Sequence, residues 1–574
     1  MKKLFAVLMI AFLVFTGCSK KGESGSSETA SSSSAGGAVA INSAVLSELG
    51  LEQVNGIYRF KQTQSITVEV FDRGLDGGRT KPEDNFYTKW IAAGMLKDHN
   101  IQVTFKAIPR WTEVDELNNQ LAAGSAPDVC VTYSYATIQS YANMGGVTDL
   151  NPFVNKYKDL FPSLWGWLDN EYINYNKDPT TGQLWSIMAK LSNPTRINTF
   201  IREDWLKKLN IPVPTTLDEF YNALVAFRDN AGTLLGADAK MIIPFSHSYD
   251  VGWRADHLFA SFIPSKITDK DYYIYGFDDR HLTRPSSVAG ETITKSGARI
   301  LNKWYNEGLT WKDFALYGEG DTTEDNMMKS GYIGAFIHSW DQPWRGGNDS
   351  ITQAMKSLAG PDANYIAITP FKNDAGAAQK YGYALTDRNV FFPASNKNPI
   401  AGLLYLDWIT KQDNLSFLQL GEEGVTRKTM SDGAVQTIAA VGEKIQNSPN
   451  NIDYTTTING IRMPTTDLTV KSIALGYTGI PVSVVDAGYH ASAEPRRTMG
   501  RPVVGEIAAE AGMDQVLKSK RDALYAQAIT APIARFDAIW DAGYRDYLAS
   551  GGQAIIDERT QKWNQFYGTK TSIE

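Results

Sequence analysis

The sequence predicts an α/β fold with a parallel sheet, because segments typical of buried strands alternate with segments typical of amphipathic helices over residues 65–135. The strand-like segments are SITVEVF, IQVTFKAIP and PDVCVTY. In parallel sheets, ligands bind in the loops at the carboxyl ends of the strands. The loops at 72–74 and 132–135 are therefore the first candidates for a binding site.

Helices are predicted between these strands and after them. Apolar residues recur at helical spacing in DNFYTKWIAAGMLKDH and in WTEVDELNNQLAAG, which separate the three strands. Further along, Thr216 and Glu219 have the spacing of a capping box at the start of a helix. Pro399 stands at a favoured first-turn position of another helix, and the chain from about residue 515 onward is predicted to be helical.

The amino terminus has the pattern of an export signal. Two lysines precede an apolar run from Leu4 to Phe15, which is too short for a comfortable membrane span, and Thr-Gly-Cys18 follows. This ending resembles a bacterial lipobox, which implies a signal peptide over 1–17 and a lipidated, palmitate-bearing Cys18. The alternative is a plain secretory signal with a chance cysteine. We expect residues 18–62 to include a flexible Ser/Gly tether that anchors the protein to the cell membrane, on its periplasmic or extracellular side.

The composition excludes some classes of function. A formal net charge of −7 gives no electrostatic reason to expect nucleic-acid binding, and no later segment is apolar over the length of a transmembrane helix. Cys130 is the one other cysteine, so no disulfide can form once Cys18 is lipidated. The chain also has 14 Trp and 27 Tyr, whose large rings with polar edges suit a ligand with flat, partly apolar faces.

Several motifs stand in one order along the chain: LNNQLAAGSAPDVCVTYSY, YANMGGVTDLNPFV, NTFIREDWLKKLNIPVPTTLDEFYNAL, GYIGAFIHSW and YGYALTDRNVFFPASNKNPIAGLLYLDWI. Together they resemble the extracellular solute-binding proteins of family 1, which are the sugar receptors of ABC importers. The carboxyl-terminal segment FDAIWDAGYRDYLASGGQAIIDERTQKWNQFY is similar to the longer subgroup that includes oligosaccharide and alginate binders. The resemblance covers roughly residues 65–570.

The resemblance implies an α/β fold of the periplasmic-binding-protein type, in which two α/β lobes are joined by hinge crossings and hold a ligand in the cleft between them. Crossings are expected near 189–196, 365–371 and 422–426. Lobe 1 then comprises 63–190 with about 366–425. Lobe 2 comprises about 191–365 with about 426–574, including the carboxyl-terminal helices.

Ligand contacts are predicted from both lobes. The resemblance places a sugar-stacking residue at Trp340, and Asp341 beside it is suited to accept sugar hydroxyls. Trp344 either continues this platform or fills the core. In lobe 1 the polar residues that follow the strands are candidates, with a surface turn as the alternative. The predicted ligand-binding residues are Trp340, Asp341, Trp344, Tyr133, Ser134, Tyr135, Asp72, Arg73, Trp185 and Trp253.

No catalytic or cofactor motif accompanies these residues. The sequence contains no P-loop, nucleophile elbow, HExxH or GxGxxG, and its six histidines lack the spacing of metal ligands. The segment DPTTG at 178–182 is interpreted as a turn rather than a calcium loop, because it lacks the alternating oxygen ligands. We therefore expect a binding protein without enzymatic activity, cofactor or metal.

The predicted function is that of a lipoprotein that captures an oligosaccharide and delivers it to the permease subunits of an ABC importer, acting as a monomer. The alternatives are a sugar receptor that reports to a membrane sensor kinase and a surface carbohydrate hydrolase. The net acidic charge favours a neutral sugar, although Arg73, Arg110 and Arg196 would suit an acidic one.

Overall fold

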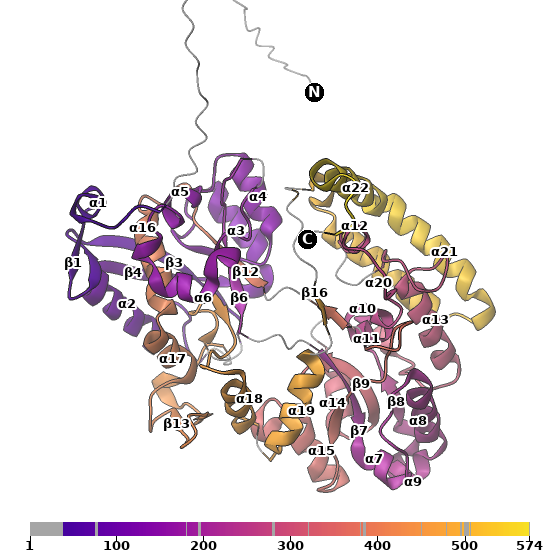
Figure 1. The fold of residues 1–574 in the computed structure, drawn as a ribbon. Coiled ribbons are helices and arrows are strands. Elements are labelled where there is room, and N and C mark those ends of the chain that lie inside the picture. Colours follow the sequence, from indigo (N-terminus) through magenta and orange to yellow (C-terminus); the bar gives the residue numbers. More distant parts are fainter. Residues whose placement is uncertain are drawn as a thin grey trace, which may run out of the picture. The chain divides into compact units, whose positions relative to one another are not determined.

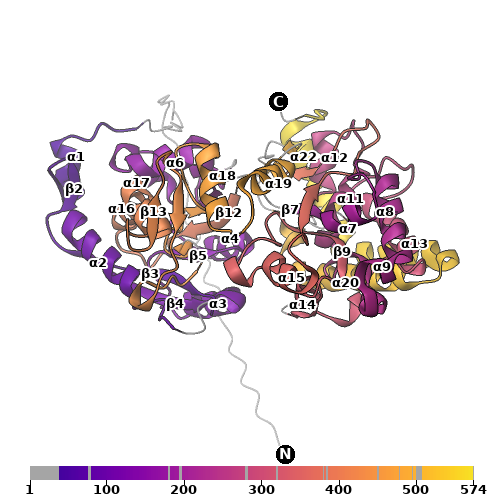
Figure 2. The ribbon, with the colours of Figure 1, turned by 90° about the horizontal axis from the view of Figure 1, so that it is seen from below.

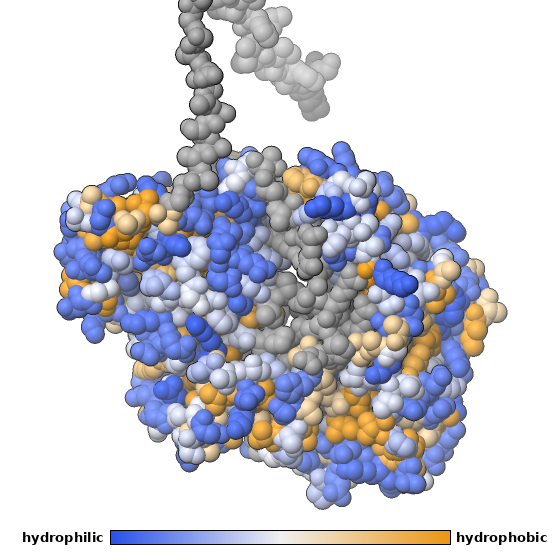
Figure 3. Space-filling view, in the orientation of Figure 1, coloured by the Kyte–Doolittle hydropathy of each residue, from blue (hydrophilic) through white to orange (hydrophobic). Residues whose placement is uncertain are grey.

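The computed structural model describes residues 38–574 apart from several short segments: 75–78, 179–180, 193–196, 278–281, 319–320, 379, 383–385, 449–450, 478, 494–495, 499–503, 505–506 and 573–574. The signal peptide, Cys18 with the rest of the expected tether up to residue 37, and Arg196 therefore lie outside the described residues. None of the helices within the described part has the length and apolar character needed to cross a bilayer. On the face drawn in Figure 3, hydrophilic residues cover much of the described surface and hydrophobic residues form separate patches.

The expected tether ends earlier than the sequence suggested. A short helix, α1 (Ser43–Glu48), and a hairpin of β1 (Leu51–Val54) and β2 (Ile57–Phe60) occupy the segment that we expected to be flexible up to residue 62. The prediction was wrong here because this segment carries apolar side chains that pack into the core of the first lobe: Val45, Leu51 and Phe60.

The first lobe is built around strands that lie far apart in the sequence. β3 (Gln64–Asp72) pairs in parallel with β4 (Ile101–Pro109), and Val68 of β3 forms a parallel bridge to Val129 just before β5. A second group has the order β15-β6-β12-β5, in which β12 alone runs against its neighbours. Its members are β5 (Cys130–Thr132), β6 (Ile187–Leu191), β12 (Thr386–Phe391) and β15 (Ile458–Asn459).

The shared direction of the other strands brings their carboxyl ends to one edge. This confirms the predicted parallel arrangement of the first three strands, with β12 as an antiparallel insertion that the sequence did not indicate. The helices of this lobe are α2 (Phe86–His99), α3 (Glu113–Ala122), α4 (Tyr135–Asn143), α5 (Asn151–Val154), α6 (Pro162–Ile173), α16 (Pro399–Thr410) and α17 (Gln412–Leu420).

Helix α16 forms the centre of the first lobe's core and begins at Pro399, as predicted. Every residue from Ile400 to Thr410 is buried, so the helix is surrounded by protein on all sides. Its Trp408 ring lies against α2 at Gly94, where a β-carbon would stand only 2.3 Å from the indole, and its Nε1 donates to Asp98 at 2.8 Å. The close approach of α2 and α16 therefore depends on the glycine.

The second lobe has a sheet of its own. Its strand order is β10-β7-β9-β8, with β8 (Ile243–Ser246) parallel to β9 (Ile333–Ser339) and β7 (Ile197–Arg202) antiparallel to both β9 and β10 (Tyr365–Ile368). Figures 1 and 2 both show the elements gathered in two groups, one around β3, β4 and β12 and one around β7 and β9.

Many helices pack around this second sheet. The predicted helical carboxyl terminus is confirmed by three consecutive helices, α20 (Asp514–Thr530), α21 (Phe536–Tyr547) and α22 (Gln553–Tyr567), which Figure 1 shows in yellow. The other helices are α7 (Glu203–Lys208), α8 (Leu217–Asp229), α9 (Ala231–Leu235), α10 (Val251–Arg254), α11 (Asp256–Ala260), α12 (Asp269–Ile274), α13 (Ile293–Asn306), α14 (Thr323–Lys329), α15 (Ile351–Ala359) and α19 (Val482–Ala493). A further helix, α18 (Thr466–Leu475), packs against both α19 and the strand β14 (Val435–Thr437).

The predicted capping box of α8 forms with a different partner. Thr216 Oγ1 accepts a hydrogen bond from the Glu219 amide, as expected for the cap. The Glu219 carboxylate reaches back to the amide and hydroxyl of Thr215 instead of the Thr216 amide, at 2.8 Å each. Both contacts thus fix the start of α8, and the contact of the Glu219 carboxylate falls one residue earlier than in the simple motif.

The chain passes between the lobes at three places, of which the third differs from the prediction. It leaves the first sheet after β6 and returns between β10 and β12. The third crossing follows β15 at Asn459 instead of falling near 422–426, because β15 pairs with β6 and Asp453 forms an ion pair with Arg73. Residues 426–459, including the hairpin of β13 (Arg427–Thr429) and β14 (Val435–Thr437), therefore belong to the first lobe.

Candidate functional site

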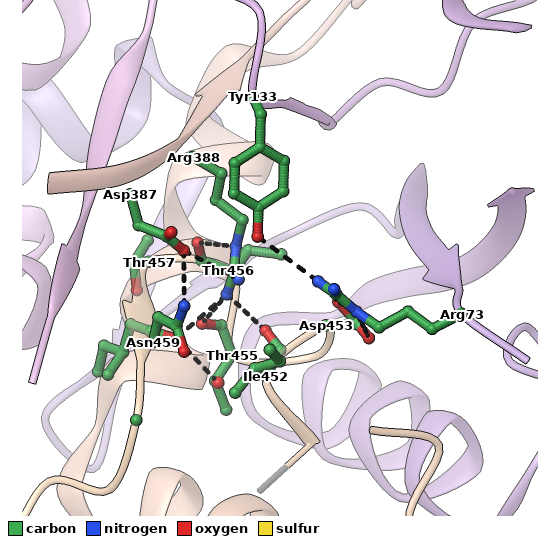
Figure 4. Close-up of polar contacts among 12 residues, drawn as sticks. Arg73, Tyr133, Asp387, Arg388, Ile452, Asp453, Thr455, Thr456, Thr457 and Asn459 are labelled. Carbon is green, nitrogen blue, oxygen red and sulfur yellow. Dashed lines mark hydrogen bonds and ion pairs between the residues drawn. The ribbon is translucent and has the colours of Figure 1, made fainter. Parts of the chain in front are cut away.

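The carboxyl edge of the first sheet gathers polar and aromatic side chains from three loops. Arg73 follows β3 and donates from Nε to both carboxylate oxygens of Asp453 at 2.9 and 3.0 Å, while its second terminal nitrogen reaches Asp453 at 2.9 Å and the Tyr133 hydroxyl at 3.5 Å (Figure 4). Burial alone would lower the pKa of Arg73, but the hydrogen bonds and charge of Asp453 outweigh it and raise the pKa. Arg73 is therefore a fixed cation at this edge.

Asp453 lies in a loop that a second arginine holds in place. Arg388, at the start of β12, is fully buried and donates to the backbone carbonyl oxygens of this loop, as Figure 4 shows. The acceptors are Ile452 at 2.5 Å, Thr455, Thr456 and Ile458 at 3.1 Å each, and Asp387 forms an ion pair with Arg388 at 3.3 Å. The carboxylate that Arg73 binds is thereby positioned by a rigid support.

Aromatic rings and a third arginine form a face beside Arg73. The Tyr133 ring is 36% exposed and stacks on Phe71 with 6.0 Å between ring centroids. The Arg110 guanidinium lies 3.9 Å from the centroid of Tyr133 and 5.4 Å from that of Trp111. Sequence reasoning missed Trp111, although its place directly after a predicted strand was a usable signal.

Glu113 fixes the backbone from which Tyr133 projects. Its carboxylate accepts from the Tyr133 amide at 2.8 Å and from the Thr132 hydroxyl at 3.0 Å, and it lies 3.1 Å from Arg110. Burial raises the pKa of Glu113, and these hydrogen bonds and the nearby arginine only partly offset that effect. Tyr133 and Arg110 are thus held by the same carboxylate.

The other predicted residues of the first lobe make local structural contacts. Ser134 caps α4 by accepting from the Thr137 amide, and the Tyr135 hydroxyl donates to the Asn176 carbonyl at 3.2 Å. Asp72 accepts from the Gly74 amide in a turn. Trp185 is half-buried against a small apolar cluster that contains Phe391. The structure therefore brings Arg73 and Tyr133 together and gives the other four residues local roles.

In the second lobe, Trp340 follows the carboxyl end of β9 and is 8% exposed. Its ring meets Tyr489 edge-on at 5.7 Å and lies 6.4 Å from the rings of both Tyr477 and Trp344. Trp344 itself is 0% exposed and packs edge-on against Phe200, so it is not part of the candidate site. Of the two roles expected for Trp344, the structure shows the one in which it fills the core.

Asp341 is occupied by neighbours of its own lobe. The Tyr477 hydroxyl donates to one carboxylate oxygen at 2.5 Å, and Arg345 pairs with the other. We expected Asp341 to accept ligand hydroxyls, but in this arrangement its carboxylate holds Tyr477 beside Trp340. Asp341 thus contributes to the aromatic group around Trp340 by positioning Tyr477.

Trp253 lies at the same end of the second sheet. It is half-buried in α10 and its ring meets His338 of β9 edge-on at 4.8 Å. Burial lowers the pKa of His338, and the charge of nearby Arg254 adds to this effect. Arg254 in turn pairs with Glu324 at 2.5 Å within the core. Trp253, His338 and Trp340 are thus placed near the carboxyl ends of the strands.

Two other features lie apart from these ligand candidates. A hollow of about 1050 Å³ is lined by Arg202 and Lys356, near the carboxyl end of β7 and the amino end of β10. Its Arg202 is already bonded to Asp204 and the Gly331 carbonyl. Within the part of the chain that the structure describes, no group of three or more His, Cys, Asp or Glu side chains could hold a metal ion.

Comparisons with known proteins agree with this architecture. A sequence model for the bacterial extracellular solute-binding protein family matches residues 80–415. Lipoprotein LipO of Bacillus subtilis (strain 168) is 26% identical over 278 residues, which are 46% of this chain and 50% of LipO. The polygalacturonan/rhamnogalacturonan-binding protein YtcQ of the same organism is 27% identical over 174 residues, 28% of this chain and 33% of YtcQ. The chain thus spans half the length or less of these two relatives.

Solved structures share the fold over most of the chain. The alginate-binding protein AlgQ2 has a TM-score of 0.59 at 16% identity, over 88% of this chain and 98% of AlgQ2. An extracellular solute-binding protein from Bifidobacterium longum subsp. infantis has a TM-score of 0.58 at 16% identity, over 89% and 99%. These likenesses confirm the predicted periplasmic-binding-protein fold. Since the family model covers more than half of the sequence, the chain belongs to the family of bacterial extracellular solute-binding proteins.

Proposed function

We propose that this protein captures an oligosaccharide between its lobes and delivers it to an ABC importer. The observation that carries the proposal is the side-chain cluster of Arg73, Tyr133 and Asp453 at the carboxyl edge of the first sheet, next to exposed aromatic rings. Sugar rings have apolar C–H faces that pack on aromatic rings and hydroxyls that need donors and acceptors. The cluster offers both kinds of contact.

The Tyr133 hydroxyl has a defined direction in this cluster. Its oxygen lies 3.5 Å from Arg73, which can only donate, so the hydroxyl proton is left to be donated elsewhere. An acceptor oxygen of a bound sugar is the partner that we assign to it. Trp340 of the second lobe supplies a further aromatic contact, and the closed arrangement of the lobes is favoured because only it allows contacts from both sides.

The proposed role involves binding without catalysis. A glycosidase needs two carboxyl groups that flank the scissile bond and serve as acid and nucleophile or base. The carboxylates of Asp453 and Glu113 are each paired with an arginine instead. Relatives named as binding proteins for alginate and for polygalacturonan/rhamnogalacturonan support an oligosaccharide as the solute.

We further propose that the protein is a lipoprotein held to the membrane through Cys18, with permease subunits as its partners and with the body acting as a monomer. The lipobox-like sequence and the likeness to lipoprotein LipO support the anchor. Expression of the full chain and of Cys18→Ser, followed by detergent phase partitioning, tests it. The parent should enter the detergent phase and the variant the aqueous phase; equal partitioning of the two would overturn the anchor.

Calorimetric titration with a panel of oligosaccharides tests the binding role. Tyr133→Phe removes the proposed donor, and we expect it to weaken binding of the best ligand by about tenfold, which corresponds to about 1.4 kcal/mol. Tyr135→Phe is the matched control, because its hydroxyl bonds to Asn176 of the protein and its loss should leave the affinity unchanged. Failure of every sugar to bind, or equal affinity of Tyr133→Phe and the parent, would contradict the proposed site.

A further inference from the structure

Trp111 is an aromatic residue with no structural explanation for its position. Its side chain is 70% exposed at the point where β4 ends, and it belongs to none of the hydrophobic clusters of the described residues. A large indole in water forgoes the favourable burial of its apolar surface. The described contact of its ring is with the Arg110 guanidinium at 5.4 Å, which leaves the rest of the ring open.

A pocket of about 330 Å³ lies beside this ring. Trp111, Arg110, Glu113 and Tyr133 line it from the first lobe, and Asp514 lines it from α20. The volume falls within the range of about 300–1,000 Å³ that is usual for small-molecule sites. The pocket therefore joins the exposed tryptophan to the Tyr133 face.

The charges around the pocket favour an uncharged occupant. Arg110 is paired with Glu113 at 3.1 Å, and Arg73 behind Tyr133 is paired with Asp453. Asp115 adds an acidic side chain to the lining. A carboxylate on the ligand would find these cations already paired and would meet additional negative charge. Neutral hydroxyls both donate and accept, so they fit an arginine–carboxylate pair without adding charge.

We propose that Trp111 and the Arg110–Glu113 pair form a subsite for an uncharged sugar ring, and that the captured oligosaccharide is neutral. The inference rests on the proposed function and narrows its ligand class. The sugar ring packs one C–H face on the indole, while its hydroxyls accept from Arg110, which the buried Glu113 carboxylate holds in place. Tyr133 contacts the next part of the same ligand.

Titration calorimetry on the full chain tests the subsite with neutral tetrasaccharides of glucose, galactose, mannose and fructose, beside tetragalacturonate. We expect a neutral tetrasaccharide to bind with an affinity that changes little with salt, and tetragalacturonate to bind at least tenfold more weakly. Trp111→Ala should weaken the neutral ligand by about tenfold or more, whereas Trp111→Phe, which keeps a ring, should retain most of the affinity.

Leu358→Ala serves as the control for loss of an exposed apolar side chain, since Leu358 is 71% exposed at the end of α15 and lines the other hollow. It should leave binding unchanged. Neutral binding that Trp111→Ala does not alter would overturn the subsite and leave the proposed function standing. Tighter, salt-sensitive binding of tetragalacturonate would overturn the neutral ligand. Lack of binding to any of these sugars would count against the proposed function, and the subsite would fall with it.

Discussion

Replacing Arg388 with methionine removes the buried donor group that supports the loop of Asp453. Methionine keeps part of the apolar length of the arginine side chain but cannot donate a hydrogen bond. Four backbone carbonyl oxygens would lose this donor inside the protein, those of Ile452, Thr455, Thr456 and Ile458. The guanidinium is fully buried, so water does not replace it readily.

The expected effect follows from the number of acceptors left without a donor. The Thr455 carbonyl keeps the Ile458 amide as a donor and the Ile458 carbonyl keeps the Thr455 hydroxyl, so the carbonyls of Ile452 and Thr456 are the two left without a described donor. A buried polar group without a partner costs about 1–3 kcal/mol, so two such groups amount to about 4 kcal/mol at the middle of that range. Breaking a buried ion pair by removal of one partner typically costs about 3–5 kcal/mol, which agrees. We therefore expect Arg388→Met to lower the free energy of unfolding by about 4 kcal/mol, a large fraction of the usual value of about 5–15 kcal/mol.

Denaturant unfolding followed by circular dichroism measures this difference. Arg345→Met is the matched control: Arg345 also pairs with an aspartate, but its own side chain is 48% exposed and Asp341 keeps the Tyr477 hydroxyl, so its loss should cost less than about 1 kcal/mol. If Arg388→Met unfolds within about 1 kcal/mol of Arg345→Met, the loop does not depend on the buried guanidinium and the reasoning is refuted.

Two further predictions concern packing and pH. Gly488→Ala places a β-carbon 2.4 Å from the Trp344 ring and should lower the free energy of unfolding by about 1–3 kcal/mol. Gly232→Ala in α9 is the control, because no atom lies within 4 Å of its new carbon and it should not lower stability. Thermal unfolding compares the two variants, and equal melting temperatures would contradict the close packing at Gly488. Burial raises the pKa of Asp407 to about 6, against about 4 when unfolded. The protonated form thus stabilises the fold fully below pH about 4, and up to about 3 kcal/mol is lost as pH rises through 6. Asp407→Asn should remove this pH dependence of the free energy of unfolding, measured from pH 4 to 7. An unchanged pH dependence in the variant would assign the effect to another group.

The sequence predicts the elements whose pattern is local. The strands that end at Asp72 and Thr132 and the helix that begins at Pro399 follow from apolar spacing, turn residues and proline, and Arg73 and Tyr133 directly follow those two strands. β15 contains only two residues, Ile458 and Asn459, so no periodicity announces it and the third crossing was placed too early.

Burial of individual rings could not be read from local sequence. Trp340, Trp344 and Trp111 all follow strands, yet one is nearly buried, one is wholly buried and one is mostly exposed. The difference arises from distant segments: Gly488 of α19 covers Trp344, while no comparable helix lies over Trp111 among its described contacts. Residues that contact each other within the site are also far apart in the sequence, since the hydrogen bond between Arg73 and Asp453 joins residues 380 positions apart.

That long span has a consequence for the order in which the protein becomes competent. Residues on both sides of the second lobe's sheet must meet before Arg73 gains Asp453, so the cluster of Arg73, Tyr133 and Asp453 is completed only after most of the polypeptide has been made. Contacts between such distant segments form slowly, because the loop between them must first close. A newly synthesised chain would therefore pass through an interval in which its first strands are folded but solute capture has not yet begun.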